Sequence, residues 1–561
     1  MGAELLVPDG TDAAVVRDAF PRVPDALQER LEHYGVLRDA TAGELLYHAG
    51  QTLPGLFVVE SGAVEILGYN SDATEETVVL RYGSGHFVGE LALLTGQSSF
   101  TTARMAESGR LRVITMDEFR RIMGEEAKLS DFLLRTLVAR REVLRTGVVS
   151  RTIEIVGDPR SRASLALRTY AARQRIPHLW LDSDSDEGST RLAEAGVSVD
   201  DLPVVFSPKG VFRRTNPGEL AHKLGLTYRS REGRIVDLAV VGAGPAGMAA
   251  AVYGASEGLT TIVLDSVNVG GQAAASSRIE NYLGFPSGIS GDKLLEKSAL
   301  QAEKFGAEIF APCSVAVLDT STGVLHLELD DGTAIEPRAV IIATGARYRA
   351  LPLDRWDEFE DSSIYYAATE MEARSCASRP LVVVGGANSA GQAALFLAGR
   401  GSRVTIVVRH DLGKDMSSYL ADRLQAEPTI TVLTESQVTA LHGDDGVLSR
   451  VTVTDAAGTA SEVDCGGLFC FIGAYPASSW LEGIALDEKG FVLTDTELAS
   501  RDLLDDTWSG LGRAPLPFET SVPGVFAVGD VRRGSMKRVA AAVGEGASAV
   551  HSVHRALGRM A

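Results

Sequence analysis

Three glycines that follow an apolar stretch have the spacing of a phosphate-binding turn. Residues 236–241 are apolar except for Asp237, and Gly242, Gly244 and Gly247 come next, before a run of small residues. The first glycine permits the bend, the second lets the backbone approach a pyrophosphate, and the third lets a helix pack on a strand. Asp265 ends the next apolar stretch, where a carboxylate can accept a hydrogen bond from a ribose hydroxyl. This pattern predicts a dinucleotide site.

A second turn of the same kind carries alanine at two of its three key positions. Ala387 replaces the glycine nearest the pyrophosphate, so its Cβ crowds the ligand there. The next predicted strand ends in a basic segment, 409–414, instead of an acid. Positive charge favours a 2′-phosphate and so NADPH over NADH, although a solvated basic turn is the alternative. The predicted NADPH site comprises Gly385, Asn388, Ser389, Ala390, Arg409, His410 and Lys414.

Two further stretches pair a buried strand with a tight turn. One is "AVIIATGARY", with its turn at Thr344 and Gly345. The other is "PGVFAVGDV", which ends in Asp530 before a long predicted helix. An acid at a strand end can hold a ribityl hydroxyl, while the positive end of the helix dipole faces an isoalloxazine. Two dinucleotide folds, one inserted in the other, indicate a flavoenzyme.

The composition restricts the classes of partner. The chain has 561 residues, too many for one core, and a net charge of −20, which opposes binding to nucleic acid or anionic lipid. Its 4 cysteines form no C-x-x-C pair and no zinc spacing. The longest apolar runs fall below the roughly 18 residues of a membrane span. We expect a soluble, cytoplasmic protein, and we assign no metal ligand and no catalytic side chain.

The elements that position these residues indicate a multidomain α/β chain. The first segment predicts a β-barrel or β-roll flanked by helices, at 24–35 and 130–145. The second predicts strand, helix, strand, an acidic loop over 182–190, a hairpin and a last helix. A polar linker over 227–234 then leads to two Rossmann-type folds. The expected domains are 1–150, 152–228, 235–353, 354–473 and 474–561.

The C-terminal half resembles the low-molecular-weight thioredoxin reductase family. "GAGPAG", "VGGQAAASSRIENYLGFP", "ATGA", "GGANSAGQAA" and "PGVFAVGDV" occur in that order. The resemblance implies FAD held by residues 235–353 and 474–561, an inserted NADPH domain, and a homodimer. The implied FAD positions are Gly242, Gly244, Gly247, Asp265, Gly271, Gln272, Asn281, Thr344, Gly345, Asp530, Arg538, Val539 and Ala540.

The resemblance fails at the redox centre. The family's C-A-T-C motif falls on Ala367, Ala368, Thr369 and Glu370. Alanine has no nucleophile and a carboxylate cannot form a disulfide, so we expect no thioredoxin reduction through this site. Cys376 lies nearby, and a single cysteine has no resolving partner, which favours an ordinary small residue there.

Residues 1–150 resemble a cyclic nucleotide-binding domain. The segment "GHFVGELALLTGQSSFTTARM" follows the phosphate-cassette pattern, with Gly89, Glu90, Leu91 and Ala92 at the phosphate and ribose positions. Ser99 occupies the place of the arginine that neutralises the cyclic phosphate, and serine offers no charge. Two interpretations stay open: a sensor with an altered nucleotide-like ligand, or a β-roll retained for docking.

Residues 152–228 resemble a thioredoxin or glutaredoxin fold. Pro203 in "DLPVVF" stands at the place of that family's cis-proline. The active-site cysteines belong near 160–164, where the chain has none. The alternative is a generic α/β unit without redox history.

The leading hypothesis is an NADPH-dependent FAD oxidoreductase whose electrons leave directly from the flavin. The acceptor is then a redox protein, a quinone-like small molecule, oxygen, or a disulfide on another protein. A redox- or ligand-sensing flavoprotein with little turnover is the alternative. A DNA-binding regulator is a third hypothesis, which the net charge of −20 opposes.

Overall fold

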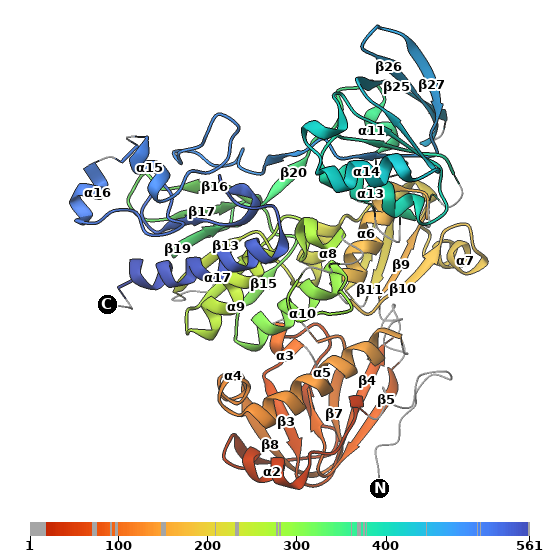
Figure 1. Cartoon of the computed structure of the whole chain (residues 1–561). Coiled ribbons are helices and arrows are strands. Elements are labelled where there is room, and N and C mark those ends of the chain that lie inside the picture. The colour runs from red at the N-terminus through yellow and green to blue at the C-terminus, as the bar shows by residue number, and fades with distance from the viewer. Residues whose placement is uncertain are drawn as a thin grey trace.

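The structure is a computed structural model of the full chain. It describes residues 18–69, 76–89, 92–95, 99–146, 153–174, 176–207, 209–229, 235–275, 279, 282–360, 362–366, 368, 372–373, 376, 379–444, 446–501, 503–504 and 506–558. Figure 1 shows the N-terminal part at the bottom, with the rest of the chain above it. We call the parts the β-roll (18–146), the middle unit (153–229), the first lobe (235–348 and 474–558) and the second lobe (349–473).

The β-roll consists of two four-stranded sheets around one core. Their orders are β1-β8-β3-β6 and β2-β7-β4-β5, and neighbouring strands in both sheets are antiparallel. The strands are β1 (Val36–Ala40), β2 (Leu45–Tyr47), β3 (Gly55–Val59), β4 (Ala63–Tyr69), β5 (Glu76–Gly83), β6 (Phe87–Val88), β7 (Thr102–Glu107) and β8 (Gly109–Thr115). The helices are α2 (Asp25–Leu31), α3 (Ala92–Thr95), α4 (Met116–Glu125) and α5 (Ala127–Thr146). The predicted β-roll with flanking helices is confirmed.

The middle unit is a mixed sheet in the order β10-β9-β11-β12. Strands β9 (Glu154–Gly157) and β10 (Leu179–Asp182) are parallel, whereas β11 (Val204–Ser207) and β12 (Gly210–Phe212) form the predicted hairpin. The helices are α6 (Arg162–Arg173), α7 (Asp186–Glu194), α8 (Pro217–Leu224) and the 3-10 turn η2 (Val199–Asp201). The Leu202–Pro203 peptide bond is cis, as the resemblance implies.

The acidic loop predicted over 182–190 is wrong for its second half. Helix α7 begins at Asp186, because the Ser185 hydroxyl accepts a hydrogen bond from the Gly188 backbone N–H. Asp186 and Glu187 lie in the first turn, where negative charge is favoured by the helix dipole. The acidic residues thus mark a helix start rather than an irregular loop.

The first lobe is built on a five-stranded parallel sheet in the order β15-β14-β13-β19-β30. These strands are β13 (Val236–Val241), β14 (Thr261–Leu264), β15 (Glu308–Phe310), β19 (Pro337–Ile342) and β30 (Val525–Ala527). Helices α9 (Pro245–Ser256), α10 (Gly291–Lys304) and α17 (Val539–Ala556) share one core with one face of the sheet. A three-stranded sheet, β16 (Val315–Asp319), β17 (His326–Leu329) and β18 (Ala334–Ile335), shares the other core. The smaller elements are η3 (Gly271–Ala275), η5 (Gly529–Val531), α15 (Thr496–Ser500) and α16 (Asp506–Leu511).

The second lobe is inserted between two paired strands of the first, β20 (Ala346–Tyr348) and β29 (Ala474–Pro476). Its parallel sheet has the order β21-β28-β22-β23-β24. The strands are β21 (Ile364–Tyr365), β22 (Leu381–Val384), β23 (Val404–Val407), β24 (Ile430–Leu433) and β28 (Gly467–Cys470). Helices α11 (Trp356–Phe359), α13 (Asn388–Ala398), α14 (Ser418–Ala426) and η4 (Leu412–Lys414) accompany it. Strands β25 (Ser436–Asp444), β26 (Val447–Asp455) and β27 (Ala460–Asp464) form an antiparallel meander that the sequence reading did not anticipate.

The β-roll contacts the middle unit and the first lobe through specific side chains. Phe100 of the β-roll belongs to the buried core of the middle unit. Leu300 on α10 of the first lobe packs against the core of the β-roll, beside α3 and α4. The N-terminal parts therefore contact the first lobe directly.

Candidate functional site

The first glycine turn has the geometry that its spacing predicts. Gly242 has φ +111°, and a Cβ there would lie 2.3 Å from the Ala343 carbonyl oxygen. A Cβ at Gly247 would lie 1.8 Å from the Gly242 carbonyl oxygen, so only glycine lets α9 approach β13 this closely. A Cβ at Gly244 would meet nothing nearer than 3.9 Å. That open position, at the N-cap of α9, is the cradle a pyrophosphate requires.

Asp265 lies directly after β14 and holds the turn together. Its Oδ2 accepts a hydrogen bond of 2.7 Å from the Ala243 backbone N–H. Its Oδ1 accepts bonds of 2.9 Å from the N–H groups of both Val267 and Asn268. A carboxylate has about four acceptor positions, so capacity remains for one ribose hydroxyl.

The loop carrying Gly271 and Gln272 closes over the glycine turn. A Cβ at Gly271, which has φ +53°, would lie 3.0 Å from the Gly244 Cα. Gln272 Nε2 donates to the Ala346 carbonyl at 3.2 Å, and Thr344 Oγ1 donates to the Ala477 carbonyl at 2.7 Å. Gly345 has φ +68°, as a tight turn requires. Asn281 lies outside the described residues.

Asp530 lies in η5, before the N-terminus of α17. Burial raises the pKa of its carboxyl, while nearby Lys537 opposes that shift. Arg538 is the N-cap of α17, and Val539 and Ala540 lie in its first turn. The backbone N–H groups of this turn have no partner within the helix and point beyond its N-terminus. The sequence reading missed Glu545, whose Oε2 accepts from the Gly529 N–H at 2.7 Å and which pairs with Arg532 at 2.9 Å. This carboxylate fixes the turn that carries Asp530.

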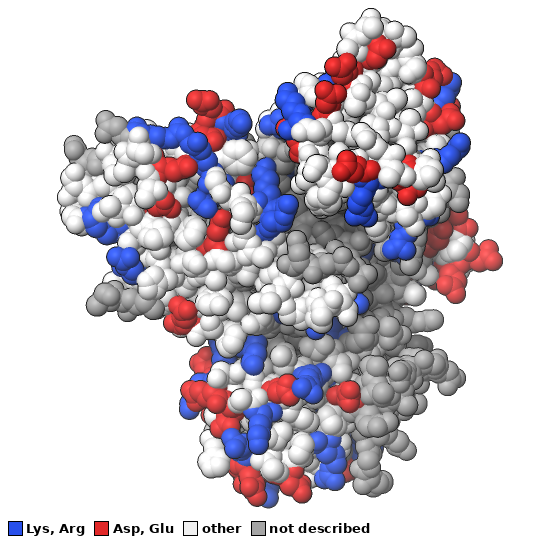
Figure 2. Space-filling view, in the orientation of Figure 1, with Lys and Arg blue, Asp and Glu red and all other residues white. Residues whose placement is uncertain are grey.

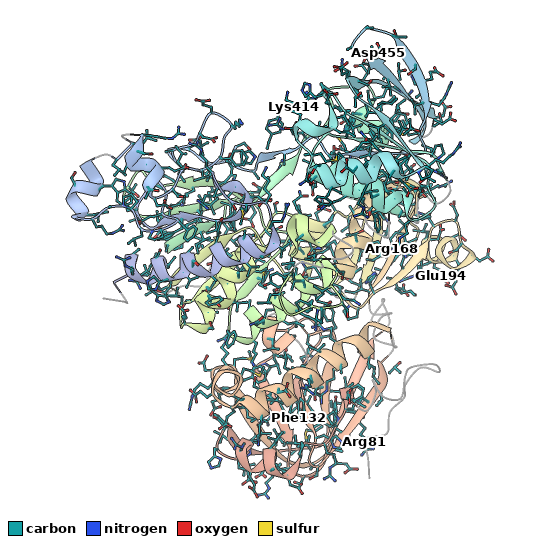
Figure 3. The ribbon with its side chains drawn as sticks, viewed as in Figure 1. Arg81, Phe132, Arg168, Glu194, Lys414 and Asp455 are labelled. Carbon is teal, nitrogen blue, oxygen red and sulfur yellow. The ribbon has the colours of Figure 1, made fainter. Side chains whose placement is uncertain are left out.

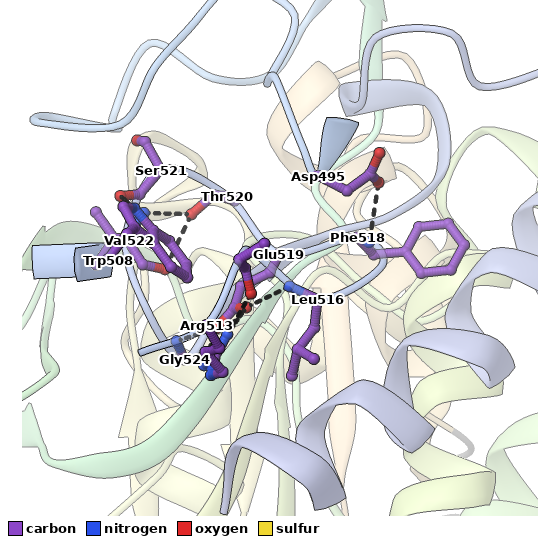
Figure 4. Close-up of polar contacts among 11 residues, drawn as sticks. Asp495, Trp508, Arg513, Leu516, Phe518, Glu519, Thr520, Ser521, Val522 and Gly524 are labelled. Carbon is purple, nitrogen blue, oxygen red and sulfur yellow. Dashed lines mark hydrogen bonds and ion pairs between the residues drawn. The ribbon is translucent and has the colours of Figure 1, made fainter. Parts of the chain in front are cut away.

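A second missed carboxylate holds the loop before β30 (Figure 4). Glu519 is completely buried and accepts a bidentate pair from Arg513 at 2.7 and 2.9 Å. It also accepts from the N–H groups of Leu516 at 2.7 Å and Gly524 at 2.9 Å. A fully satisfied buried ion pair orders this loop, which leads into the strand that ends at Asp530.

The second glycine turn is tighter at its start and more exposed at its middle. Gly385 has φ +144°, and a Cβ there would lie 2.4 Å from the Phe471 carbonyl oxygen. Ala387 is the exposed N-cap of α13. Asn388 Oδ1 accepts from the Ser417 N–H at 2.8 Å and from its hydroxyl at 2.9 Å. Ser389 is exposed and Ala390 is fully buried.

The three basic candidates of the second turn lie beyond β23 on the surface. Arg409, His410 and Lys414 are all exposed, and none of their side chains makes a hydrogen bond or ion pair with a described residue. Figure 3 places Lys414 on the side of the second lobe that faces the first lobe. In Figure 2, blue Lys and Arg atoms gather along the facing edges of the two lobes. The structure thus brings basic groups together with the second turn, as a 2′-phosphate site requires.

Comparison with known families assigns the first and second lobes to a protein family. The model described as pyridine nucleotide-disulphide oxidoreductase matches residues 236–546, which is more than half of the chain. The chain belongs to the pyridine nucleotide-disulphide oxidoreductase family. A second model, described as cyclic nucleotide-binding domain, matches residues 37–126 within the β-roll.

Individual members of the family show the same extent of similarity. Thioredoxin reductase of Treponema pallidum is 32% identical over 316 residues, 56% of this chain and 95% of that protein. Thioredoxin reductase of Bacillus subtilis is 33% identical over 325 residues, 57% of this chain and 95% of that protein. The solved thioredoxin reductase of Lactococcus lactis has a TM-score of 0.50 at 29% identity, covering 58% of this chain and 100% of that one. The two lobes are therefore thioredoxin reductase-like.

All 4 cysteine thiols of the chain are buried, and burial raises the pKa of each one. The chain has 4 cysteines, and Cys313, Cys376, Cys465 and Cys470 are free and buried. Burial raises the pKa of Cys313, Cys465 and Cys470 to about 12 each, and it raises the pKa of Cys376 as well. Of the four positions expected to carry the dithiol, Ala367, Thr369 and Glu370 lie outside the described residues, and Ala368 packs against the core of the second lobe.

The cassette of the β-roll is held by an arginine that the sequence reading did not select. Arg140 on α5 donates to the Gly89 carbonyl at 2.7 Å and stacks over Phe87 at 4.0 Å. Ser99 is buried, and its hydroxyl donates to the Thr101 carbonyl at 2.8 Å. Ala92 begins α3, whereas Glu90 and Leu91 lie outside the described residues. Ser99 therefore binds within its own turn, and its place at the family's arginine position stays a prediction.

The described ranges contain neither a metal-binding cluster nor a membrane-spanning helix. No group of three or more His, Cys, Asp or Glu side chains there could hold a metal ion. No helix in the same ranges is long and apolar enough to cross a membrane.

Proposed function

We propose that this chain is an NADPH-dependent FAD oxidoreductase of thioredoxin reductase type, in which electrons pass from the flavin to an acceptor without a protein dithiol. The first turn, with Gly244 open and Asp265 able to accept one more bond, fits FAD. The second, with Arg409, His410 and Lys414 unpaired, fits NADPH. Bound FAD supplies the capacity to take a hydride and to release electrons singly or in pairs.

The single observation that carries this proposal is the state of the cysteines. A redox dithiol needs two thiols within bonding distance and a low pKa for one of them. All 4 cysteines of the chain are buried, and burial raises the pKa of every one. Electrons that enter this flavin therefore have no thiol relay within the chain.

We propose only the chemical class of the electron acceptor. The thioredoxin reductases to which the lobes are similar suggest a redox protein partner, and a small oxidant such as a quinone meets the same electron count. We include homodimerisation in the proposal, on the same resemblance. The β-roll, which matches the cyclic nucleotide-binding domain, supports a nucleotide-like ligand.

An anaerobic rapid-mixing experiment tests the reductive half of the reaction. The FAD-loaded protein is mixed with NADPH and then with NADH, and bleaching of the flavin absorbance is followed. We expect fast bleaching with NADPH, slower bleaching with NADH, and recovery when a quinone or a redox protein is added. No bleaching with either nucleotide would refute the proposal.

A thiol titration tests whether all the cysteines are buried, which is the observation that carries the proposed function. A coloured disulfide reagent is added to the native and to the denatured protein. We expect no fast-reacting thiol in the native chain and 4 after denaturation, because every cysteine is buried. Two fast thiols in the NADPH-reduced native protein would restore a dithiol mechanism.

A second candidate is a redox- or ligand-sensing flavoprotein with little turnover. The contact of α3, within the cassette, with α10 of the first lobe favours it, because a ligand in the β-roll then touches the flavin lobe through one helix. Steady NADPH consumption well above oxygen leakage, with any acceptor, favours the enzyme. Single-turnover reduction without sustained consumption favours the sensor.

A further inference from the structure

The middle unit and the first lobe are joined at the adenosine end of the first turn. Gln174, the C-cap of α6, donates from Nε2 to the Asn268 Oδ1 at 3.0 Å and to the Ala311 carbonyl at 3.0 Å. Asn268 is 7% exposed, and its backbone N–H donates to the Asp265 Oδ1 at 2.9 Å. A relay of hydrogen bonds thus connects the middle unit to the carboxylate that faces the ribose position.

The same two parts, together with Glu372 and residues 362 and 364–366 of the second lobe, line one open cavity of about 2010 Å³. Helix α6 contributes Thr169, Tyr170 and Ala172 to its wall. The first lobe contributes residues 266–268, next to Asp265, and 312–314, next to Ala311. The cavity therefore reaches the residues that follow β14, beside Asp265. An adenosine attached to the pyrophosphate would extend toward this end of β14.

One buried polar group in this wall has no partner. Tyr170 is 3% exposed, and its hydroxyl makes no hydrogen bond with a described residue. Burial raises the pKa of this hydroxyl, so it remains a neutral donor. A buried hydroxyl without a partner costs free energy, and a ligand that accepts its hydrogen bond would recover that cost.

We propose that the middle unit, which lacks redox cysteines, is a wall of the FAD site, with Gln174 as the positioning residue of its adenosine end. Gln174 holds Asn268, and Asn268 holds the Asp265 carboxylate in the orientation that a ribose hydroxyl needs. This inference rests on the proposed binding of FAD. It gives the middle unit a binding role that needs no thiol.

The test compares two flavins in the full chain stripped of cofactor. FMN lacks adenosine, so Gln174→Ala should weaken FAD by about tenfold and leave FMN within about twofold, as loss of one adenosine-positioning contact predicts. Dissociation constants are measured by quenching of flavin fluorescence. Gln425→Ala, which removes an exposed glutamine from α14 of the second lobe, should change neither constant.

Asn268→Ala provides the second variant, and the double variant measures the coupling. If Gln174 acts through Asn268, the double variant should bind FAD no more weakly than Asn268→Ala alone. Equal weakening of FAD and FMN, or unchanged FAD affinity in Gln174→Ala, would overturn the proposal. Flavin reduction by NADPH at saturating FAD should be unchanged in Gln174→Ala, and its failure in the wild type would instead refute the proposed function.

Discussion

The two glycine turns share one sequence pattern but differ in how far the surrounding elements cover them. In the first, Gly247 lies against the backbone of Gly242 in the turn, and Gly271 closes over Gly244. In the second, Ala387 is exposed at the start of α13, and the side chains of Arg409, His410 and Lys414 make no hydrogen bond or ion pair with a described residue. One turn is enclosed by other elements, and the other faces solvent.

The difference in coverage predicts a difference in how fast each ligand dissociates. A site enclosed by loops, a helix N-terminus and the middle unit releases its ligand only when several contacts break together. An exposed turn whose recognition rests on surface charge exchanges its ligand readily and depends on salt. We infer that the first turn retains FAD across turnovers, whereas the second admits and releases NADPH in each one.

The largest effect should come from adding a methyl group at the third position of the first turn. Gly247→Ala places a Cβ 1.8 Å from the Gly242 carbonyl oxygen, so backbone must move, at a cost of about 3 kcal/mol or more. We expect loss of bound FAD after gel filtration and a lower melting temperature. The matched change in the second turn, Ala390→Gly, removes a methyl group and should cost about 1 kcal/mol.

Gly544→Ala serves as the control for that pair. Gly544 lies in α17, and a Cβ there meets nothing within 4 Å, so this variant should keep its FAD and gain slightly in stability. Full FAD retention in Gly247→Ala would show that the turn can open, and the contrast between the turns would fail.

The elements around these turns were predictable because their signals are local. Glycines at fixed spacing and mainly apolar strands such as β13 and β22 identify parallel strands buried on both faces. The helix α8 follows from Asn216, Glu219 and the left-handed Gly225. Each of these signals lies within a few residues of the structure it specifies.

The unpredicted features depend on residues far apart in the chain. Glu545 binds Gly529 across 16 positions, and Gln174 binds Asn268 across 94. No local spacing encodes such pairs, because they exist only once separate elements have packed. The meander β25–β27 was missed for a different reason, since its alternating strands lack a nearby motif to indicate their role.

The second-largest effect concerns charge at the open turn. Arg409→Ala together with Lys414→Ala should raise the KM for NADPH by about tenfold, equivalent to about 1.4 kcal/mol, because two unpaired cations that can meet a 2′-phosphate are lost. The KM for NADH, which lacks that phosphate, should stay the same. Initial rates with both nucleotides check this, with Arg423→Ala of α14, another exposed basic residue, as the control. Parallel rises for NADH and NADPH would mean that the basic segment steers any anion.

A smaller effect is expected from the carboxyl at the enclosed site. Burial raises the folded-state pKa of Asp530 above its unfolded value, so its contribution to stability is present at low pH and is lost as pH rises through the folded pKa. Asp530→Asn should therefore stabilise the cofactor-free protein at neutral pH by about 1 kcal/mol, because it removes the cost of desolvating a charge, and the gain should vanish in acid. The variant should also bind FAD more weakly. Melting curves across pH, with and without FAD, check both; a gain that grows in acid would contradict the assignment.

The smallest effect tests whether the methyl group at the open turn limits binding. Ala387→Gly removes the Cβ nearest the predicted pyrophosphate and supplies a better N-cap for α13, so NADPH should bind about two- to threefold more tightly. The reciprocal change, Gly244→Ala, has room in the protein itself, since its Cβ would meet nothing nearer than 3.9 Å. It should leave the melting temperature of the cofactor-free protein unchanged and still weaken FAD, because the space it fills belongs to the ligand. If Ala387→Gly leaves NADPH affinity unchanged while Gly244→Ala weakens FAD, the open turn holds its nucleotide at a greater distance, and surface charge alone accounts for its recognition.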